Sequence, residues 1–403
     1  MSLLSIRDAL ARIDAAVTVL PPQRVSIGQA LHRVTAGAVV AACDLPPFDQ
    51  SSMDGYALRA AEVQVLPARF PLAATVAAGP HDALPVLPAG HACRIYTGGL
   101  IPQGADTVVR QEWTTRDGDQ VLILRATPVG QDLRRRGEEL SASTVLMPAG
   151  RRLNAGHVAM LAMAGVAELD VRAEPRITVL VSGDEVVDAG RELRPGEVYN
   201  ANGPLMAAWL ARAGYAPPRV AALADTEADV RAGLQRAFAE SDLVLTSGGV
   251  SVGDRDLILP QAEALGAQRL FWKVAQKPGK PLYVARHQAC LLMGLPGNPA
   301  SVLVNLASFV RRALDRLEGV DPAGPLQHRG VLAASVRCDA ERDTWLRVRT
   351  ELDDHGVMRL HPQGQQASHM LSNLAAADAL AWIAAASAPL PAGAVVPWID
   401  LGL

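Results

Sequence analysis

Lysine is almost absent from this 403-residue chain. Lys and Arg together number 38, yet only three are lysines, and all lie in one loop at Lys273, Lys277 and Lys280. An ammonium group is compact and strongly hydrated whereas a guanidinium is planar, so the loop has kept a distinct kind of cation. Two prolines restrict this loop and Gly279 permits close approach, which favours binding of a phosphate or another oxyanion. The alternative is a solvated turn in which the lysines cluster by accident.

Aromatic residues and net positive charge are also scarce. Phe, Trp and Tyr make up 4% of the chain and the formal net charge is -3. Nucleic-acid binders usually need a basic surface and aromatic side chains on which bases stack. We therefore expect no nucleic acid among the partners.

Only four cysteines are present, and none forms a CxxC pair. This excludes the usual zinc-site spacing and a disulfide framework, and it favours reduced thiols in the cytoplasm. The nine histidines contain no HExxH motif. One uncharged run, residues 379–399, is long enough to suggest a membrane span, but three prolines divide it. We predict two buried strands joined by a Pro-Gly turn, and a soluble cytoplasmic protein without a membrane segment.

From residue 177 onward, short apolar runs alternate with helical patterns. The predicted strands are 177–182, 220–223, 243–247, 282–285 and 290–295. Helices are predicted over 202–213, 227–240 and 299–317. This alternation is typical of a mostly parallel, doubly wound α/β sheet. The segment after the Pro- and Gly-rich linker 319–325 has little helical periodicity and is expected to be β-rich.

A glycine-rich turn follows the strand predicted at 243–247. Its sequence, TSGGVSVGDRD, runs from Thr246 to Asp256 and precedes a helical segment. Paired glycines let backbone N–H groups face an anion, and ligands of doubly wound sheets bind at such strand ends. An ordinary structural turn with a helix cap is the alternative.

Carboxylates follow other strand ends of the same sheet. Asp184 and Glu185 follow the first strand and Asp225 follows the second. Carboxylates from several strand ends can converge on Mg²⁺, which keeps waters and shares phosphate ligands. Each acid taken alone could be a cap or a surface charge. The turn LPGNP, Leu295 to Pro299, could contact a ligand or simply start a helix.

Eight segments, in the same order, resemble the MoeA family over nearly the whole chain. They are FDQSSMDGYAL, RIYTGG, RRRGEE, SGDEVV, TSGGVSVGDRD, KVAQKPGKPL, LPGNPAS and HPQGQQASHML. The resemblance implies a multidomain α/β subunit with a central doubly wound, MogA-like domain and a C-terminal β-barrel. The expected divisions are an N-terminal and linker domain (1–49 and 136–173), an inserted β-rich domain (50–135), the MogA-like domain (174–320) and the barrel (325–403).

The resemblance also implies a function. The chain would insert molybdenum from molybdate into adenylylated molybdopterin, release AMP and use Mg²⁺. It would form a homodimer whose site is shared between subunits, with the molybdopterin adenylyltransferase as a candidate partner protein.

Site residues follow from the matching motifs. Residues of one subunit would face those of the other, and the catalytic set would be Asp54 and Thr97 opposite Glu185, Asp225, Asp256, Lys273 and Lys277. Glu185 and Asp256 would bind Mg²⁺. The substrate-binding set would be Ser247, Gly248, Gly249, Ser251, Gly253, Lys280, Pro296, Gly297, Asn298 and, at the periphery, Ser368.

Two other functions remain open from the sequence. The central domain alone also resembles the molybdopterin adenylyltransferases, although the additional N- and C-terminal regions argue against that activity. A non-catalytic binding or scaffold protein is the other alternative, since gephyrin relatives of the family partly have that role. ATP consumption with molybdopterin would indicate the first, and a bound ligand that is never turned over would indicate the second.

Overall fold

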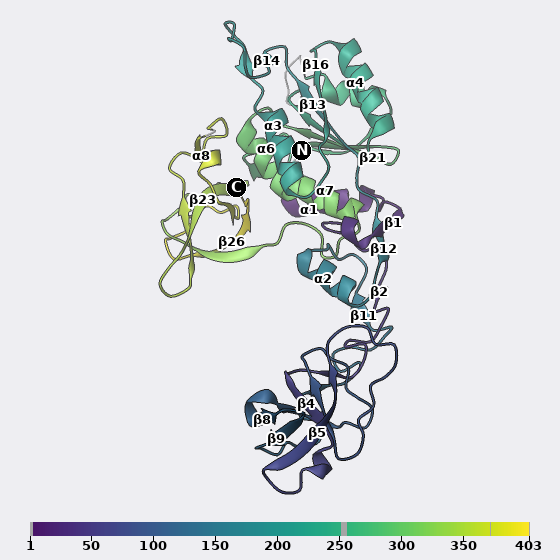
Figure 1. Ribbon diagram of the computed structural model, residues 1–403. Coiled ribbons are helices and arrows are strands. Elements are labelled where there is room, and N and C mark those ends of the chain that lie inside the picture. The colour runs from purple at the N-terminus through teal and green to yellow at the C-terminus, as the bar shows by residue number, and fades with distance from the viewer. Residues whose placement is uncertain (1–2, 251–255, 371, 403) are drawn as a thin grey trace.

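The computed structural model describes residues 3–250, 256–370 and 372–402, and Figure 1 shows an elongated molecule. A helix-covered sheet, here called the central domain, lies at one end with a β-barrel beside it. A second β-rich domain, here called the distal domain, lies at the other end. A narrow region of short strands and one helix, here called the neck, joins the two ends. Ser251 and Gly253, both predicted to bind substrate, lie outside the described residues.

The central domain is built on a six-stranded sheet. In spatial order its strands are β16 (Arg219–Leu223), β13 (Ile177–Ser182), β17 (Leu243–Ser247), β21 (Cys290–Leu295), β20 (Tyr283–His287) and β18 (Gln268–Trp272). The first four strands are parallel, and the last two pairings are antiparallel. All five predicted strands are present. The edge strand β18 was not predicted, because QRLFW begins with two exposed polar residues and has no continuous apolar run.

Helices cover both faces of this sheet, as the doubly wound prediction requires. They are α3 (Asn202–Arg212), α4 (Glu227–Glu240), α5 (Ile258–Ala264) and a continuous stretch of α6 (Pro299–Asn305), the π-helix η4 (Leu306–Val310) and α7 (Arg311–Leu317). Helix α4 begins where the Thr226 hydroxyl accepts a hydrogen bond from the backbone N–H of Asp229. Alternate residues of β13 enter separate cores, Val179 on one face and Leu180 on the other. The parallel strands therefore present their carboxyl ends at one edge.

The C-terminal region is a closed five-stranded barrel, which confirms the predicted β-barrel. Its strands pair in the order β23 (Asp343–Leu352), β24 (Met358–Pro362), β22 (His328–Leu332), β26 (Val395–Asp400) and β25 (Ala379–Ile383), and β25 pairs back with β23. A short helix, α8 (Ser372–Ala375), precedes β25. The uncharged run forms β25 and β26, the two predicted strands, and they pair with each other in antiparallel fashion. Over the described ranges, no helix has the length and apolar character needed to cross a membrane.

The N-terminal half contains the distal domain and the neck. The distal sheet has the order β7 (Thr107–Arg110), β4 (Gly55–Leu58), β6 (Ala92–Ile95), β5 (Ala68–Val76), β9 (Gln120–Ile123) and β8 (Thr114–Asp117). Two 3₁₀ turns, η2 (Ala60–Glu62) and η3 (Gln111–Trp113), accompany it.

The neck is made of short elements. It comprises η1 (Ile27–Gln29), α2 (Ala155–Met163) and three strand pairs, β1 (Pro22–Ser26) with β12 (Glu168–Arg172), β2 (Val39–Val40) with β11 (Val145–Met147) and β3 (Gln50–Ser51) with β10 (Leu133–Arg134). The N-terminal helix α1 (Ile6–Ala16) instead contributes Ile6, Ala9 and Ile13 to the central core.

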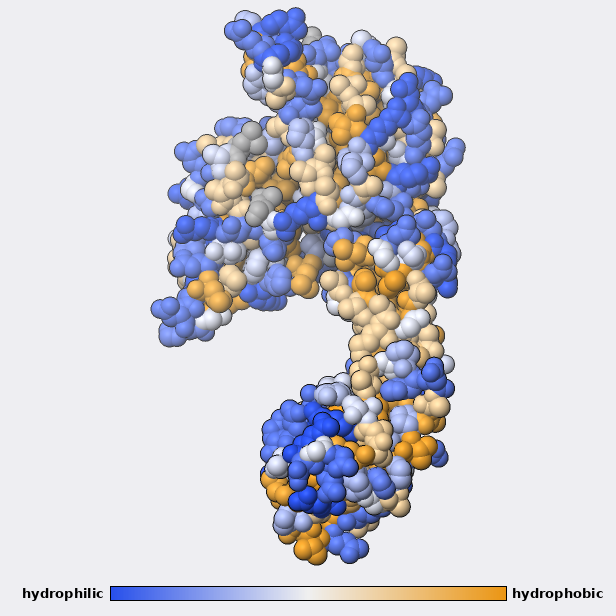
Figure 2. Space-filling view, in the orientation of Figure 1, coloured by the Kyte–Doolittle hydropathy of each residue, from blue (hydrophilic) through white to orange (hydrophobic). Residues whose placement is uncertain are grey.

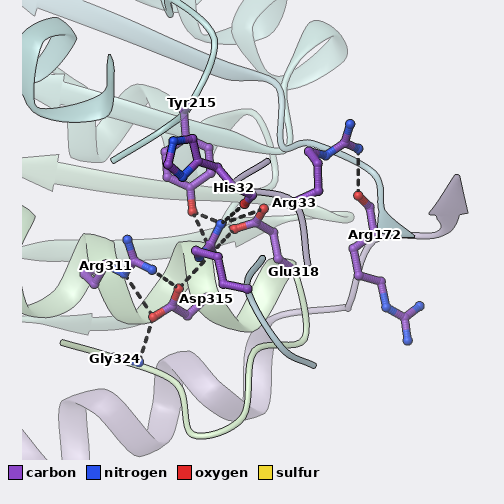
Figure 3. Close-up of polar contacts among 9 residues, drawn as sticks. His32, Arg33, Arg172, Tyr215, Arg311, Asp315, Glu318 and Gly324 are labelled. Atoms are coloured by element: carbon purple, nitrogen blue, oxygen red, sulfur yellow. Dashed lines mark hydrogen bonds and ion pairs between the residues drawn. The ribbon is translucent and has the colours of Figure 1, made fainter. Parts of the chain in front are cut away.

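Buried ion pairs fasten the neck to the central domain. Arg152 lies 3.0 Å from Asp315 and 2.5 Å from Glu318, measured from Nη2 to the nearer carboxylate oxygen. Figure 3 shows these two carboxylates with Tyr215 and Arg311 beside them. The Tyr215 hydroxyl donates to Glu318 at 2.6 Å, and burial raises the pKa of that hydroxyl. The carboxylates of Asp315 and Glu318 are only 1% and 2% exposed. Removal of one partner from such a cluster leaves a buried, uncompensated charge, so the cluster holds the two parts in one arrangement.

Candidate functional site

The lysine loop belongs structurally to two domains. It leaves β18 of the central sheet, and β19 (Gln276–Lys277) then pairs in parallel with β23 of the barrel. Lys273 adopts a positive φ of 72° and its backbone N–H donates to the Leu282 carbonyl at 2.9 Å. Its ammonium nitrogen lies 3.9 Å from the ring centroid of Trp272, a favourable cation–π contact. Lys273 is thereby held beside an aromatic face, whereas Lys277 and Lys280 are exposed.

A cavity of about 620 Å³ lies where this loop meets the barrel. Four predicted residues of the central domain line it, namely Lys277, Lys280, Pro296 and Asn298. The barrel contributes Arg342, Ser368 and His369. The Asn298 side-chain amide donates to the Ser368 hydroxyl at 3.0 Å, so the two domains meet directly in the cavity wall. Ser368 was expected at the periphery, but it lines the same cavity as the two exposed lysines.

Three cationic side chains therefore surround this cavity. Lys277 and Lys280 come from the loop, and Arg342 comes from the barrel, where it is also paired with Asp339 at 2.7 Å. The arrangement is suited to an anion with several oxygens, because ammonium groups act as point charges and a guanidinium adds directional donors. Arg342 and His369 were not identified from the sequence. Arg342 lies outside the eight matching segments, and His369 lies in HPQGQQASHML but was given no role.

The predicted turns at strand ends are tied together by a buried amide. The Asn202 side chain donates to the Ser247 hydroxyl and to the Gly297 carbonyl, each at 2.6 Å. Gly248 and Gly249 follow with φ of 87° and 67°, a conformation that favours glycine. A Cβ on Gly249 would lie 2.7 Å from Ile258, so the close approach of this turn to α5 also requires glycine.

The predicted acids follow the same edge of the sheet. Asp184 and Asp225 are joined reciprocally, because each backbone N–H donates to the other residue's carboxylate, at 3.2 and 3.0 Å. Glu185 is exposed beside them, and Asp256 is partly buried beyond β17. In the part of the chain that the structure describes, no group of three or more His, Cys, Asp or Glu side chains could hold a metal ion. Among the described residues, a magnesium site would rest on one or two carboxylates completed by water or substrate oxygens, which is common for Mg²⁺.

Asp54 and Thr97 form a separate pair in the distal domain. The backbone N–H and the hydroxyl of Thr97 both donate to one Asp54 oxygen at 2.8 Å. These bonds, the backbone bond first, lower the pKa of Asp54, so the carboxylate is ionised at neutral pH. Figure 1 shows the distal domain at the opposite end of the molecule from the central sheet. One chain therefore does not bring this pair to the lysine cavity.

Comparisons with known proteins cover all three parts of the chain. Residues 4–165 match the model described as the MoeA N-terminal region (domain I and II). Residues 178–316 match a probable molybdopterin binding domain, and residues 329–401 match the MoeA C-terminal region (domain IV).

Relatives extend over the same span. A molybdopterin molybdenumtransferase from Nostoc sp. is 34% identical over 390 residues, which is 94% of this chain and 89% of the relative. This chain belongs to the MoeA family. Molybdopterin molybdenumtransferase 2 from Mycobacterium tuberculosis is 35% identical over 89% of this chain and 90% of its own length.

A solved structure agrees with this membership. The molybdopterin biosynthesis MoeA protein from Pyrococcus horikoshii superposes with a TM-score of 0.82 at 26% identity, over 99% of both chains. The predicted MoeA resemblance and the multidomain α/β fold are confirmed. As a MoeA family member, the chain is a transferase of molybdenum cofactor biosynthesis. The individual site residues and the domain boundaries stay predictions.

Proposed function

We propose that this chain inserts molybdenum from molybdate into adenylylated molybdopterin and releases AMP. The observation that carries the proposal is the cavity between the central domain and the barrel. It is lined by two of the only three lysines in the chain, Lys277 and Lys280, and by Arg342. A cationic, water-accessible cavity next to a glycine-rich strand end suits a substrate made of an oxyanion and a pyrophosphate-linked nucleotide.

The roles of the chain's own residues follow from their positions. Lys277 and Lys280 hold the molybdate oxygens, and Asn298 with Ser368 closes the cavity wall. Ser247 and Gly249 would offer the substrate phosphates a hydroxyl and a backbone N–H, in a turn kept in place by Asn202. The Gly248 N–H already donates to the Leu295 carbonyl, so Gly248 would shape the turn around the phosphates. The family motifs also imply contacts with the substrate for four further residues, and these belong to the proposal: Lys273, Pro296, Gly297 and Asp225.

The carboxylates fit a hydrated Mg²⁺. Glu185 and Asp256 are the residues that would hold it, because both follow parallel strands whose carboxyl ends share one edge. The ion would supply neutralisation of negative charge beside the pyrophosphate bond. Asp184 and Asp225 keep the neighbouring strand ends together through their reciprocal hydrogen bonds.

A homodimer would complete the site. Asp54 and Thr97 of the partner subunit would face the lysine cavity, since the distal domain of the same chain lies at the far end of the molecule. The neck offers a surface for association, because Figure 2 shows apolar residues along it, and Val40, Val145 and Met163 are 46%, 59% and 61% exposed. The division into four domains at 1–49 with 136–173, 50–135, 174–320 and 325–403 belongs to this proposal.

A cytoplasmic location also belongs to the proposal. All four cysteines are free thiols, which suits a reducing compartment. The molybdopterin adenylyltransferase, whose product would be the substrate here, is the expected partner enzyme.

Purified protein should be mixed with adenylylated molybdopterin, molybdate and Mg²⁺, and AMP release followed together with protein-bound molybdenum. Both should appear in step, and neither should appear when molybdate or Mg²⁺ is omitted. Consumption of ATP with molybdopterin would indicate an adenylyltransferase instead. Tight binding of the nucleotide substrate without AMP formation would indicate a binding protein.

A further inference from the structure

The amide of Gln276 is fully buried at the base of the lysine loop. Its side-chain nitrogen donates to the Gly279 carbonyl at 3.0 Å and to the Asn305 side-chain oxygen at 2.8 Å. Its oxygen accepts a hydrogen bond from the indole N–H of Trp345 at 3.2 Å. Gln276 and Asn305 are 0% exposed and Trp345 is 5% exposed. Both amide hydrogens and the oxygen of Gln276 are thus engaged away from water.

These contacts link three parts of the fold. Gln276 lies in the loop itself, Asn305 lies on α6 of the central domain and Trp345 lies on β23 of the barrel. The Asn305 amide in turn donates to the Ser301 carbonyl, one turn earlier on α6. The backbone pairing of β19 with β23 lies beside this cluster, and the Asp343 N–H donates to the Ala275 carbonyl at 3.0 Å. The barrel therefore contacts the loop through both its backbone and an indole.

Displacement of the loop would leave buried polar groups without partners. A buried donor or acceptor that loses its partner costs more free energy than the bond contributes when made. The backbone at Gly279 is also tightly packed, because a Cβ there would lie 2.9 Å from the side-chain nitrogens of both Gln276 and Asn305. The Gln276 amide therefore fixes the position of the backbone between Lys277 and Lys280 through its hydrogen bond to the Gly279 carbonyl.

We propose that Gln276, held by the indole N–H of Trp345, is a positioning residue that sets the spacing of Lys277 and Lys280 for oxyanion binding. Gln276 lies in the cavity wall, but its amide is fully engaged by protein groups, and Trp345 does not line the cavity. The identity of the oxyanion as molybdate rests on the proposed function. The effect of Gln276 on the spacing of the two lysines can be measured by binding alone.

The barrel provides a matched pair of tryptophans for the test. Trp345 and Trp382 face each other on β23 and β25, with ring centroids 6.2 Å apart and planes inclined by 24°. Only the Trp345 indole donates to Gln276, whereas the buried indole nitrogen of Trp382 has no hydrogen-bond partner among the described residues. Substitution by phenylalanine removes the same atoms from the same stack in both variants, although Trp345 is the more deeply buried of the two.

Molybdate binding to the full chain should be measured by equilibrium dialysis, together with the KM for molybdate and kcat of AMP release. Trp345→Phe should weaken molybdate binding and raise KM about fivefold while kcat changes less than about twofold, since one hydrogen bond is lost. Trp382→Phe should leave binding and KM within about twofold of wild type. Gln276→Met, of similar volume, should weaken binding about tenfold or more.

Equal molybdate binding by the two tryptophan variants would overturn the proposal, as would absence of molybdate binding by the wild-type protein. If Gln276→Met does not fold, the tryptophan pair still decides the question. If wild-type protein releases no AMP but binding still separates Trp345→Phe from Trp382→Phe, the proposed function fails and the positioning role stands.

Discussion

The lysine loop and the Asp54–Thr97 pair are held in place in different ways. The loop is fixed by groups from other elements, above all Asn305 and Trp345, through a buried amide. Asp54 is fixed locally, by two hydrogen bonds from Thr97 at the surface of the distal domain. One region therefore depends on how two domains pack, whereas the other keeps its geometry as long as the distal sheet is folded. The two can be perturbed independently.

The largest expected effect concerns the junction between these two ends. Arg152→Met should lower the free energy of unfolding by about 3 kcal/mol, because Glu318 would stay buried without its cationic partner, while Asp315 would keep only Arg311. Denaturant unfolding of the purified protein measures this. The control is Arg24→Met, whose pairing with Glu168 is more than half exposed on both sides and should cost less than about 1 kcal/mol. Equal losses in the two variants would show that the cluster does not hold the junction.

Exchange of the lysine cation should have the next largest effect. Lys277→Arg keeps the charge but replaces a point-like ammonium by a planar group at the cavity wall, so kcat/KM for AMP release should fall about a hundredfold. The opposite exchange, Arg286→Lys on β20 of the central sheet, is the control and should leave turnover unchanged. Wild-type turnover by Lys277→Arg would mean that only charge matters in the loop.

The acid beyond β17 should give a smaller, metal-specific effect. Asp256→Asn removes a negative ligand, so the Mg²⁺ concentration for half-maximal AMP release should rise about tenfold. Steady-state rates over a Mg²⁺ series measure this, with Glu192→Gln at an exposed position as the control. An unchanged Mg²⁺ dependence in Asp256→Asn would remove this residue from the proposed ligand set.

The smallest effect is expected at the locally fixed pair. Thr97→Val removes the hydroxyl donor but retains the backbone N–H, the larger cause of the lowered Asp54 pKa, so that pKa should rise only part of the way to its ordinary value. Because the pKa of Asp54 is lower in the folded state than in the unfolded state, the ionised carboxylate stabilises the fold at pH values above the unfolded-state pKa. This stabilisation is lost as the pH falls through the folded-state pKa. In Thr97→Val this loss should begin at higher pH.

An NMR titration of the Asp54 carboxyl carbon measures this change. Thr115→Val, at an exposed position in the distal sheet, is the control. An Asp54 pKa that is the same in Thr97→Val as in wild type would show that the hydroxyl contributes nothing.

The sequence predicted the central domain well for a physical reason. The strands β13, β17 and β21 are fully buried apolar runs, so their bounds coincide with the predicted ones. The edge strand β18 was not predicted, because only Phe271 of its five residues is buried. The distal sheet was harder to delimit, since its short strands mix buried and exposed residues around turns.

The candidate site also has one part that the sequence predicted and one part that it could not predict. The scarcity of lysine pointed to the loop, and the structure places two of its lysines in a cavity wall. The role inferred for Gln276 could not be predicted, because its partners Asn305 and Trp345 are 29 and 69 residues away in sequence. Such a contact exists only after the barrel has packed on the central domain.

We propose that Asp54 of one subunit and Lys277 of the other act in one site, and mixing of inactive variants tests this most directly. Asp54→Ala and Lys277→Ala should each lose nearly all AMP release when assayed alone. After subunit exchange, half of the dimers should be mixed and one of the two sites in each should be intact, so about a quarter of wild-type activity should return. A mixture that exchanges subunits yet stays inactive would contradict the claim.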